Sequence, residues 1–284
     1  MNHWCFVIVA FLGLSTAHAL QVTDDRAVAV SFAQPPQRIV SLLPSLTEMV
    51  CALDRCQHLV GVDRYSNFPA SVRALPKLGG GLDPSVEAIV ALRPDVVLLA
   101  TSSPAMARLE SLGIKVIALE PKTHADVRRV LTVLGQLLSV PDAQRVWRKL
   151  DEGLFMVAKS LPQKSPKTQV YFEVNSGPYA AGEASFIGET LTRLGVANIV
   201  PAALGTFPKL NPEFVVRANP DVILVGDSQF DGMAQRPGWA GMRAIQAKRV
   251  CVFTPEQSDM IVRPGPRMLD AARLIAQCLK DKAP

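Results

Sequence analysis

The stretch that decides the fold is Pro84-Ser-Val-Glu-Ala-Ile-Val-Ala-Leu-Arg-Pro-Asp-Val-Val-Leu-Leu99. Its first half has apolar residues at helical spacing, a Pro-Asp pair follows, and a run of Val and Leu ends it. A Pro-Asp pair favours a turn, and a short β-branched run after a turn is typical of a buried strand. The stretch therefore predicts a helix over 84–92 and a strand over 95–100.

A second stretch repeats this pattern: Pro212-Glu-Phe-Val-Val-Arg-Ala-Asn-Pro-Asp-Val-Ile-Leu-Val225. Glu87 stands eight residues before Asp95, and Glu213 stands the same eight residues before Asp221. Both stretches are embedded in regions where apolar runs and helical patterns alternate. Such alternation indicates βαβ units and a mainly parallel sheet, so the chain is predicted to contain two related α/β lobes.

Further elements are expected on both sides of these two stretches. Around the first we predict strands over 38–42, 59–62 and 115–119 and helices over 45–53 and 105–112. Around the second we predict strands over 169–174 and 249–253 and helices over 186–194, 212–218 and 266–279. Ser45, with Glu48 three residues later, resembles a capping box at the start of its helix.

A long helical region separates the two lobes, from about 125 to 161, interrupted at Val140-Pro141-Asp142. Its second helix is expected to begin at Pro141, since proline suits a first helical turn. We therefore predict an α/β fold with two parallel-sheet lobes, 20–122 and 167–284, bridged by one long helix within a helical linker over 123–166. Two lobes create a cleft between them, a usual place for a small ligand.

The first 19 residues have the pattern of a secretory signal peptide. An apolar run from Trp4 to Leu14 precedes Ala17-His18-Ala19, which fits a cleavage site. The run is too short to span a bilayer, which takes about 20 residues. We expect a soluble periplasmic protein; an uncleaved anchor is the alternative.

Several functional classes lack their signals in the sequence. The net charge is only +5 and no Lys/Arg run stands out, so we expect no nucleic-acid binding. There is no Gly-x-Ser-x-Gly or His-Glu-x-x-His motif, and Gly79-Gly80-Gly81 lacks the Lys of a phosphate loop. His58 and His124 are expected at the surface, and Glu48 and Glu120 at helix ends. We predict no catalytic residues, no metal and no cofactor; a secreted enzyme is a remote alternative.

Four cysteines follow the expected cleavage site, at positions 51, 56, 251 and 278. An oxidising compartment permits disulfides. Cys51 and Cys56 could pair across a helix end, and Cys251 and Cys278 could pair if the last helix folds back on its strand. Zinc binding is the alternative, although neither pair has the short Cys-x-x-Cys spacing.

Three stretches together resemble a known family: Arg38-Ile-Val-Ser-Leu-Leu-Pro-Ser-Leu-Thr-Glu48, Val60-Gly-Val-Asp-Arg-Tyr-Ser-Asn-Phe-Pro69 and Val86-Glu-Ala-Ile-Val-Ala-Leu-Arg-Pro-Asp95. They are similar to the helical-backbone, or class III, periplasmic binding proteins of ABC importers, and most of all to members that bind vitamin B12. The resemblance runs from about 38 to 279. It implies capture of cobalamin or a related corrinoid and delivery to an inner-membrane permease, by a protein we expect to be a monomer. Haem, with Tyr65 as an iron ligand, or a ferric siderophore is the alternative ligand.

The resemblance also implies which residues act. Ligand contacts are implied for Tyr65, Phe207, Asp259 and Arg263, and less closely for Tyr179. Gly81 and Ala100 stand where relatives have tryptophans, which implies a roomier cleft or a different corrinoid. Glu87 and Glu213 match the glutamates, one on each lobe, that dock on the permease.

Overall fold

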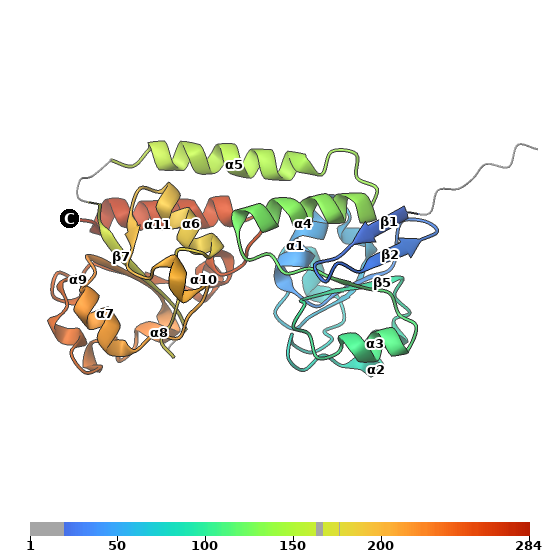
Figure 1. The fold of residues 1–284 in the computed structure, drawn as a ribbon, viewed down its shortest axis with the longest axis horizontal. Coiled ribbons are helices and arrows are strands. Elements are labelled where there is room, and N and C mark those ends of the chain that lie inside the picture. Colours follow the sequence, from blue (N-terminus) through green and yellow to red (C-terminus); the bar gives the residue numbers. More distant parts are fainter. Residues whose placement is uncertain (1–19, 163–166, 176) are drawn as a thin grey trace, which may run out of the picture.

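A computed structural model describes residues 20–162, 167–175 and 177–284. The signal-peptide prediction concerns residues outside these ranges. The described chain forms two α/β lobes, and the long helix α5 (Gln144–Lys159) extends along one side of both (Figure 1). None of the helices in the described ranges is both long enough and apolar enough to span a membrane.

The N-terminal lobe is built on a parallel four-stranded sheet. Its strand order is β4-β3-β5-β6. The strands are β3 (Ile39–Ser41), β4 (Leu59–Val62), β5 (Val96–Leu99) and β6 (Val116–Ala118), and the helices are α1 (Pro44–Ala52), α2 (Val86–Ala91) and α3 (Met106–Ser111). A hairpin that the sequence patterns did not predict, β1 (Leu20–Thr23) with β2 (Ala29–Phe32), packs against α4 (His124–Leu137).

The C-terminal lobe has a five-stranded sheet in which β7 is central. The main order is β11-β10-β7-β8, with β9 also paired to β7; only β8 runs antiparallel. The strands are β7 (Gln169–Asn175), β8 (Tyr179–Ala180), β9 (Ala197–Asn198), β10 (Val222–Gly226) and β11 (Val250–Phe253). The helices are α6 (Phe186–Arg193), α7 (Pro212–Ala218), α8 (Asp227–Phe230), α9 (Arg243–Gln246), α10 (Pro255–Ile261) and α11 (Met268–Lys282).

The predicted repeat is confirmed in the hydrogen bonds of its Pro-Asp turns. The Asp95 carboxylate accepts a hydrogen bond from the backbone N–H of Arg38 at 2.8 Å. The Asp221 carboxylate accepts one from the N–H of Gln169, also at 2.8 Å. Each aspartate therefore ties the end of a helix to the start of the first strand of its own sheet.

The bridging helix contacts both halves of the molecule. Helix α5 packs against α4 on one side and against α6 and α11 on the other, and one continuous apolar core runs beneath it through both lobes. The helix begins at Gln144, three residues later than predicted, because 141–143 form a turn. A shared core and a stiff helix leave the lobes little freedom to move apart.

Both predicted disulfides are present. Cys51 is bonded to Cys56 at the end of α1, and Cys251 to Cys278, which ties α11 back onto β11. The zinc alternative was wrong, because all four sulfurs are used in these bonds.

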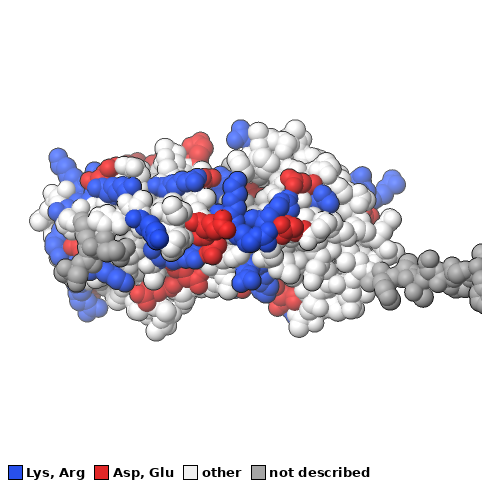
Figure 2. Space-filling model, turned by 90° about the horizontal axis from the view of Figure 1, so that it is seen from above, with Lys and Arg blue, Asp and Glu red and all other residues white. Residues whose placement is uncertain are grey.

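The surface on the α5 side carries charges of both signs. Figure 2 shows Lys and Arg side chains interspersed with Asp and Glu over this face. Several are paired, as in Arg148–Asp142 at 2.6 Å. Among the described residues seen in this view, the two signs are mixed rather than gathered into a patch of one sign.

Candidate functional site

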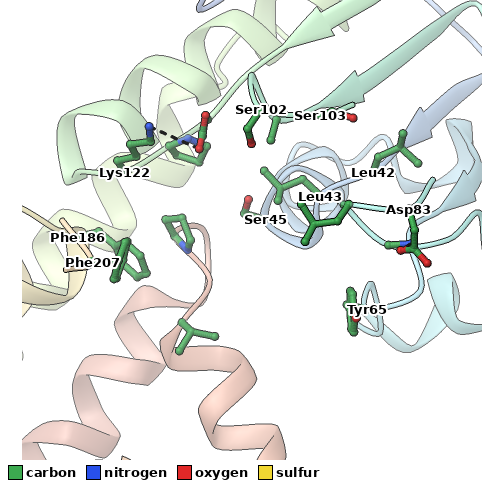
Figure 3. Close-up of a pocket in the computed structure, with 18 residues that line it drawn as sticks. Leu42, Leu43, Ser45, Tyr65, Asp83, Ser102, Ser103, Lys122, Phe186 and Phe207 are labelled. Carbon is green, nitrogen blue, oxygen red and sulfur yellow. Dashed lines mark hydrogen bonds and ion pairs between the residues drawn. The ribbon is translucent and has the colours of Figure 1, made fainter. Parts of the chain in front are cut away.

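A cavity of about 470 Å³ opens between the two lobes, within the range of about 300–1,000 Å³ usual for ligand pockets. Most of its lining follows the carboxyl ends of the N-terminal strands, where ligands of parallel α/β sheets commonly bind. The lining residues are Leu42, Leu43, Ser45, Tyr65, Gly80, Gly81, Leu82, Asp83, Ala100, Ser102, Ser103, Glu120, Pro121, Lys122, Phe186, Phe207, Val262 and Pro264 (Figure 3).

The two lobes contribute unequally to this lining. Leu42 and Leu43 follow β3, the segment 100–103 follows β5, and the segment 120–122 follows β6. The C-terminal lobe adds two phenylalanines and the pair Val262 and Pro264 that follows α10. A bound molecule would therefore rest on the N-terminal lobe and be covered by the other.

Exposed apolar side chains surround the cavity. Tyr65 is 59% exposed and Phe207 38%, and Phe207 meets Phe186 edge to face with ring centroids 6.1 Å apart. Leu82 is 87% exposed, and no sequence pattern had singled it out. The one signal near it was the Gly79-Gly80-Gly81 run, which predicted a flexible turn just before it. Apolar groups gathered from both lobes at one opening mark an interaction site.

The lining has room where relatives were expected to place tryptophans. A Cβ added to Gly81 would meet no atom within 4 Å. Ala100, the second such position, also lines the cavity. The wider cleft expected at these two positions agrees with this geometry.

The charged groups of the lining are compensated. Asp83 forms an ion pair with Arg64, and Glu120 lies 3.5 Å from the Lys122 ammonium and accepts the Thr101 hydroxyl. The cavity therefore presents little uncompensated charge to a ligand.

The Tyr65 loop is anchored within its own lobe by Asp63. This fully buried carboxylate accepts the backbone N–H of Tyr65 at 2.8 Å and the Ser66 hydroxyl. Burial raises the pKa of Asp63, partly offset by its hydrogen bond from Ser66. Thr47 on α1 extends the chain, with its hydroxyl 2.9 Å from that of Ser66.

The same loop is held from the opposite lobe by Arg263. Its guanidinium donates to the Tyr65 carbonyl at 3.0 Å, to Asn67 Oδ1 at 2.7 Å and to Glu48 Oε1 at 3.1 Å. It also donates to Asp259 at 2.6 Å. With only 7% of the residue exposed, Arg263 joins the lobes as a buried link next to the cavity.

Glu48 is the centre of this link, and its predicted place at an exposed helix end was wrong. It is 3% exposed and also accepts two hydrogen bonds from Arg267, at 2.8 and 2.5 Å. The predicted capping box was wrong too, because α1 starts one residue earlier with Leu43 at the N-cap and no side-chain cap. Glu48 points instead at arginines more than 200 residues away in sequence.

The residues implied as ligand contacts occupy three kinds of place. Tyr65, Gly81 and Phe207 line the cavity. Arg263 and Asp259 lie beside it in the link between the lobes, with Asp259 also accepting from the Asn67 amide at 2.9 Å. Tyr179 lies on β8, outside the lining, and is 41% exposed. Contact of these residues with a ligand stays a prediction.

Glu87 and Glu213 occupy matching positions in the first turns of α2 and α7. Both are exposed, as docking on a partner would require. Neither forms an ion pair with any residue in the described ranges. The two helices lie on the side of the molecule away from α5 (Figure 1). These carboxylates are available to a partner on that side.

His124 is buried rather than at the surface, which corrects the sequence-based expectation. It is 8% exposed at the start of α4, with Nε2 3.0 Å from the Phe186 carbonyl and 2.9 Å from the Thr190 hydroxyl of α6. Burial lowers its pKa to about 4. Within the described ranges, no cluster of three or more His, Cys, Asp or Glu side chains could hold a metal ion.

Comparison with known proteins agrees with this architecture. Residues 39–257 match the family model described as periplasmic binding protein. The chain is 27% identical to an uncharacterised ABC transporter substrate-binding lipoprotein of Bacillus subtilis, over 91% of this chain and 84% of that protein. It is 25% identical to the vitamin B12-binding protein of Pectobacterium carotovorum, over 88% of this chain and 90% of that protein.

Solved structures show the same fold. The periplasmic haem-binding protein of Roseiflexus aligns with a TM-score of 0.74 and 25% identity, over 87% of this chain and 99% of its own. The periplasmic vitamin B12-binding protein of Vibrio cholerae aligns with a TM-score of 0.71 and 23% identity, over 87% and 98%.

Proposed function

Because this chain belongs to the periplasmic binding protein family, we propose that it is the substrate-binding component of an ABC importer and that its ligand is cobalamin or a related corrinoid. The observation that supports this choice of ligand is the composition of the cavity. It combines aromatic and apolar surface from both lobes with hydroxyls and balanced charges. A corrin is a broad, largely apolar disc fringed with uncharged amides, so its faces suit Tyr65 and Phe207.

The distribution of cations argues against a strongly anionic ligand such as a ferric tris-catecholate siderophore. Among the described residues, Lys122 is the one Lys or Arg in the lining, and it faces Glu120. Arg263 and Arg267 both pair with the buried carboxylate of Glu48. Withdrawing an arginine from a buried partner is costly, because the partner is left without its counter-charge.

Haem is the second candidate, on the strength of Tyr65. Its side chain is largely exposed in the lining, where a phenolate could reach an iron atom. The haem-binding relative of Roseiflexus shares the fold and a quarter of the aligned residues. No histidine lies in the lining within the described chain, so Tyr65 would be the only aromatic ligand to the metal.

The partner in this proposal is an inner-membrane permease, met by Glu87 and Glu213. Exposed charges add little to folding stability but steer and orient a partner. With one carboxylate on each lobe, both can bind at once only if two basic patches on the permease have the matching spacing. The protein would act outside the cytoplasm, bind rather than catalyse, and need no cofactor of its own.

Gel filtration after mixing tests the ligand. The purified protein is incubated separately with cyanocobalamin, hemin and ferric enterobactin, a trianionic siderophore complex, and the absorption spectrum of the protein peak is recorded. We expect corrin bands at one equivalent per chain. If the protein peak retains hemin, seen by its Soret band, but no corrinoid, the ligand would be assigned as haem. A protein peak free of all three ligands would contradict both candidates.

A further inference from the structure

We propose that the N-terminus of α1, together with the Ser45 hydroxyl, is a subsite that binds an acceptor oxygen of the ligand. The inference rests on the proposed function and refines it. It assigns a ligand contact to a residue that the sequence pattern favoured as a helix cap.

The first observation is a set of free backbone donors. Helix α1 has nine residues, its N-cap Leu43 offers no side-chain cap, and its first turn contains no acidic residue. Within the described chain, the N–H groups of Leu43 and Ser45 donate to no protein acceptor. Both residues line the cavity. The partial positive charge of the helix end therefore meets the cavity without compensation.

The second observation is independent of the helix end. Ser45 is 98% buried, since only 2% of it is exposed, and its Oγ has no hydrogen-bond partner. Ser103, on the loop after β5, also lines the cavity with an unpartnered Oγ. Figure 3 shows Ser45 in the middle of the lining, between the residues of the two lobes. Buried hydroxyls are nearly always hydrogen-bonded, so two without partners around one cavity point to a molecule that supplies them.

The chemistry of the subsite selects an acceptor. Backbone N–H groups can only donate, and the helix end favours electron-rich oxygen. In a corrinoid that oxygen could belong to a peripheral amide carbonyl or to the phosphodiester of the nucleotide loop. The lining carboxylates Asp83 and Glu120 already have partners, so they do not compete for these donors.

Calorimetric titration of wild type and Ser45→Ala tests the subsite. The titrants are cyanocobalamin, dicyanocobinamide, which keeps the peripheral amides but lacks the phosphodiester, and hemin, whose carboxylates supply acceptor oxygens. We expect Ser45→Ala to weaken cyanocobalamin binding by about fivefold to tenfold. An equal loss with dicyanocobinamide assigns the oxygen to an amide, and a loss confined to cyanocobalamin assigns it to the phosphodiester.

A matched control is Ser111→Ala, which removes an exposed hydroxyl at the end of α3, outside the lining, and should leave affinity unchanged. Ser45→Ala should melt at the wild-type temperature or above, because its hydroxyl caps nothing. Wild type that binds hemin alone overturns the corrinoid but keeps the subsite if Ser45→Ala weakens hemin. Equal affinities of wild type and Ser45→Ala for every ligand that binds would overturn the subsite, and wild type that binds none of the three contradicts both proposals.

Discussion

Replacing Arg263 by Gln should lower the free energy of unfolding by about 3 kcal/mol. The wild-type guanidinium makes four hydrogen bonds, to Glu48, Asn67, the Tyr65 carbonyl and Asp259. Removing one partner of a buried ion pair costs about 3–5 kcal/mol, because the remaining charge is left unpaired. The lower end applies here, since Arg267 still donates two hydrogen bonds to Glu48.

Urea unfolding followed by circular dichroism measures this loss. The matched control is Arg273→Gln on α11. Arg273 pairs with Asp270 on the same helix, much as Arg263 pairs with the nearby Asp259, but both side chains of the control pair are more than half exposed. Exposed pairs contribute about 0–1 kcal/mol, so this variant should unfold close to wild type. Similar small losses in both variants would show that Arg263 does not act as a buried link between the lobes.

The same substitution should weaken corrinoid binding by about 1–3 kcal/mol. Arg263 holds the Tyr65 carbonyl and Asp259, so its loss frees the loop that presents Tyr65 to the cavity. Unchanged affinity in a calorimetric titration would show that the position of this loop does not depend on Arg263.

Three further changes follow from the same structure. Reversing Glu87 and Glu213 together to Lys should leave ligand affinity and melting temperature nearly unchanged but abolish stimulation of the importer's ATPase in reconstituted membranes. As a control, reversing the exposed Glu152 and Glu256 to Lys should leave this stimulation intact. Normal stimulation by the variant with Glu87 and Glu213 reversed would refute docking through these two residues. The buried His124 has a pKa of about 4, against 6.5 in the unfolded chain. The free energy of unfolding should therefore fall by on the order of 3 kcal/mol as pH falls from 6.5 to 4, because the unfolded chain takes up the proton first. Parallel curves of unfolding free energy against pH for wild type and His124→Gln over this range would contradict this expectation. Replacing Cys251 and Cys278 by Ser should destabilise the protein by about 3–4 kcal/mol and replacing Cys51 and Cys56 by about 2 kcal/mol, because the first bond closes the longer loop; thermal melts showing the reverse order would contradict the loop argument.

The local patterns of the sequence predicted the lobes well. The repeated Pro-Asp turns, the apolar strands and the long helical region all have local causes, and each predicted element is present within a few residues. Helix α10 was missed although Thr254 and Gln257 form a capping box at its start, a signal that the sequence already contained. The hairpin β1–β2 had no comparable turn signal.

The link between the lobes could not be read from local patterns. Glu48 looked like a helix-end residue because its arginine partners lie 215 and 219 positions away. His124 looked like a surface residue because the groups that bury it come from α6, more than 60 positions later. Long-range polar contacts leave no period in the sequence, so these residues needed the folded chain to be understood.

The most direct test of a corrinoid held between the lobes is the position of its cobalt. Crystals grown with cyanocobalamin would be measured at the cobalt absorption edge, and an anomalous difference map would locate the metal. We expect one peak per chain in the cavity, between Tyr65 and Phe207. Corrinoid bound at one equivalent in solution, with its cobalt peak on an outer face of either lobe, would contradict the account.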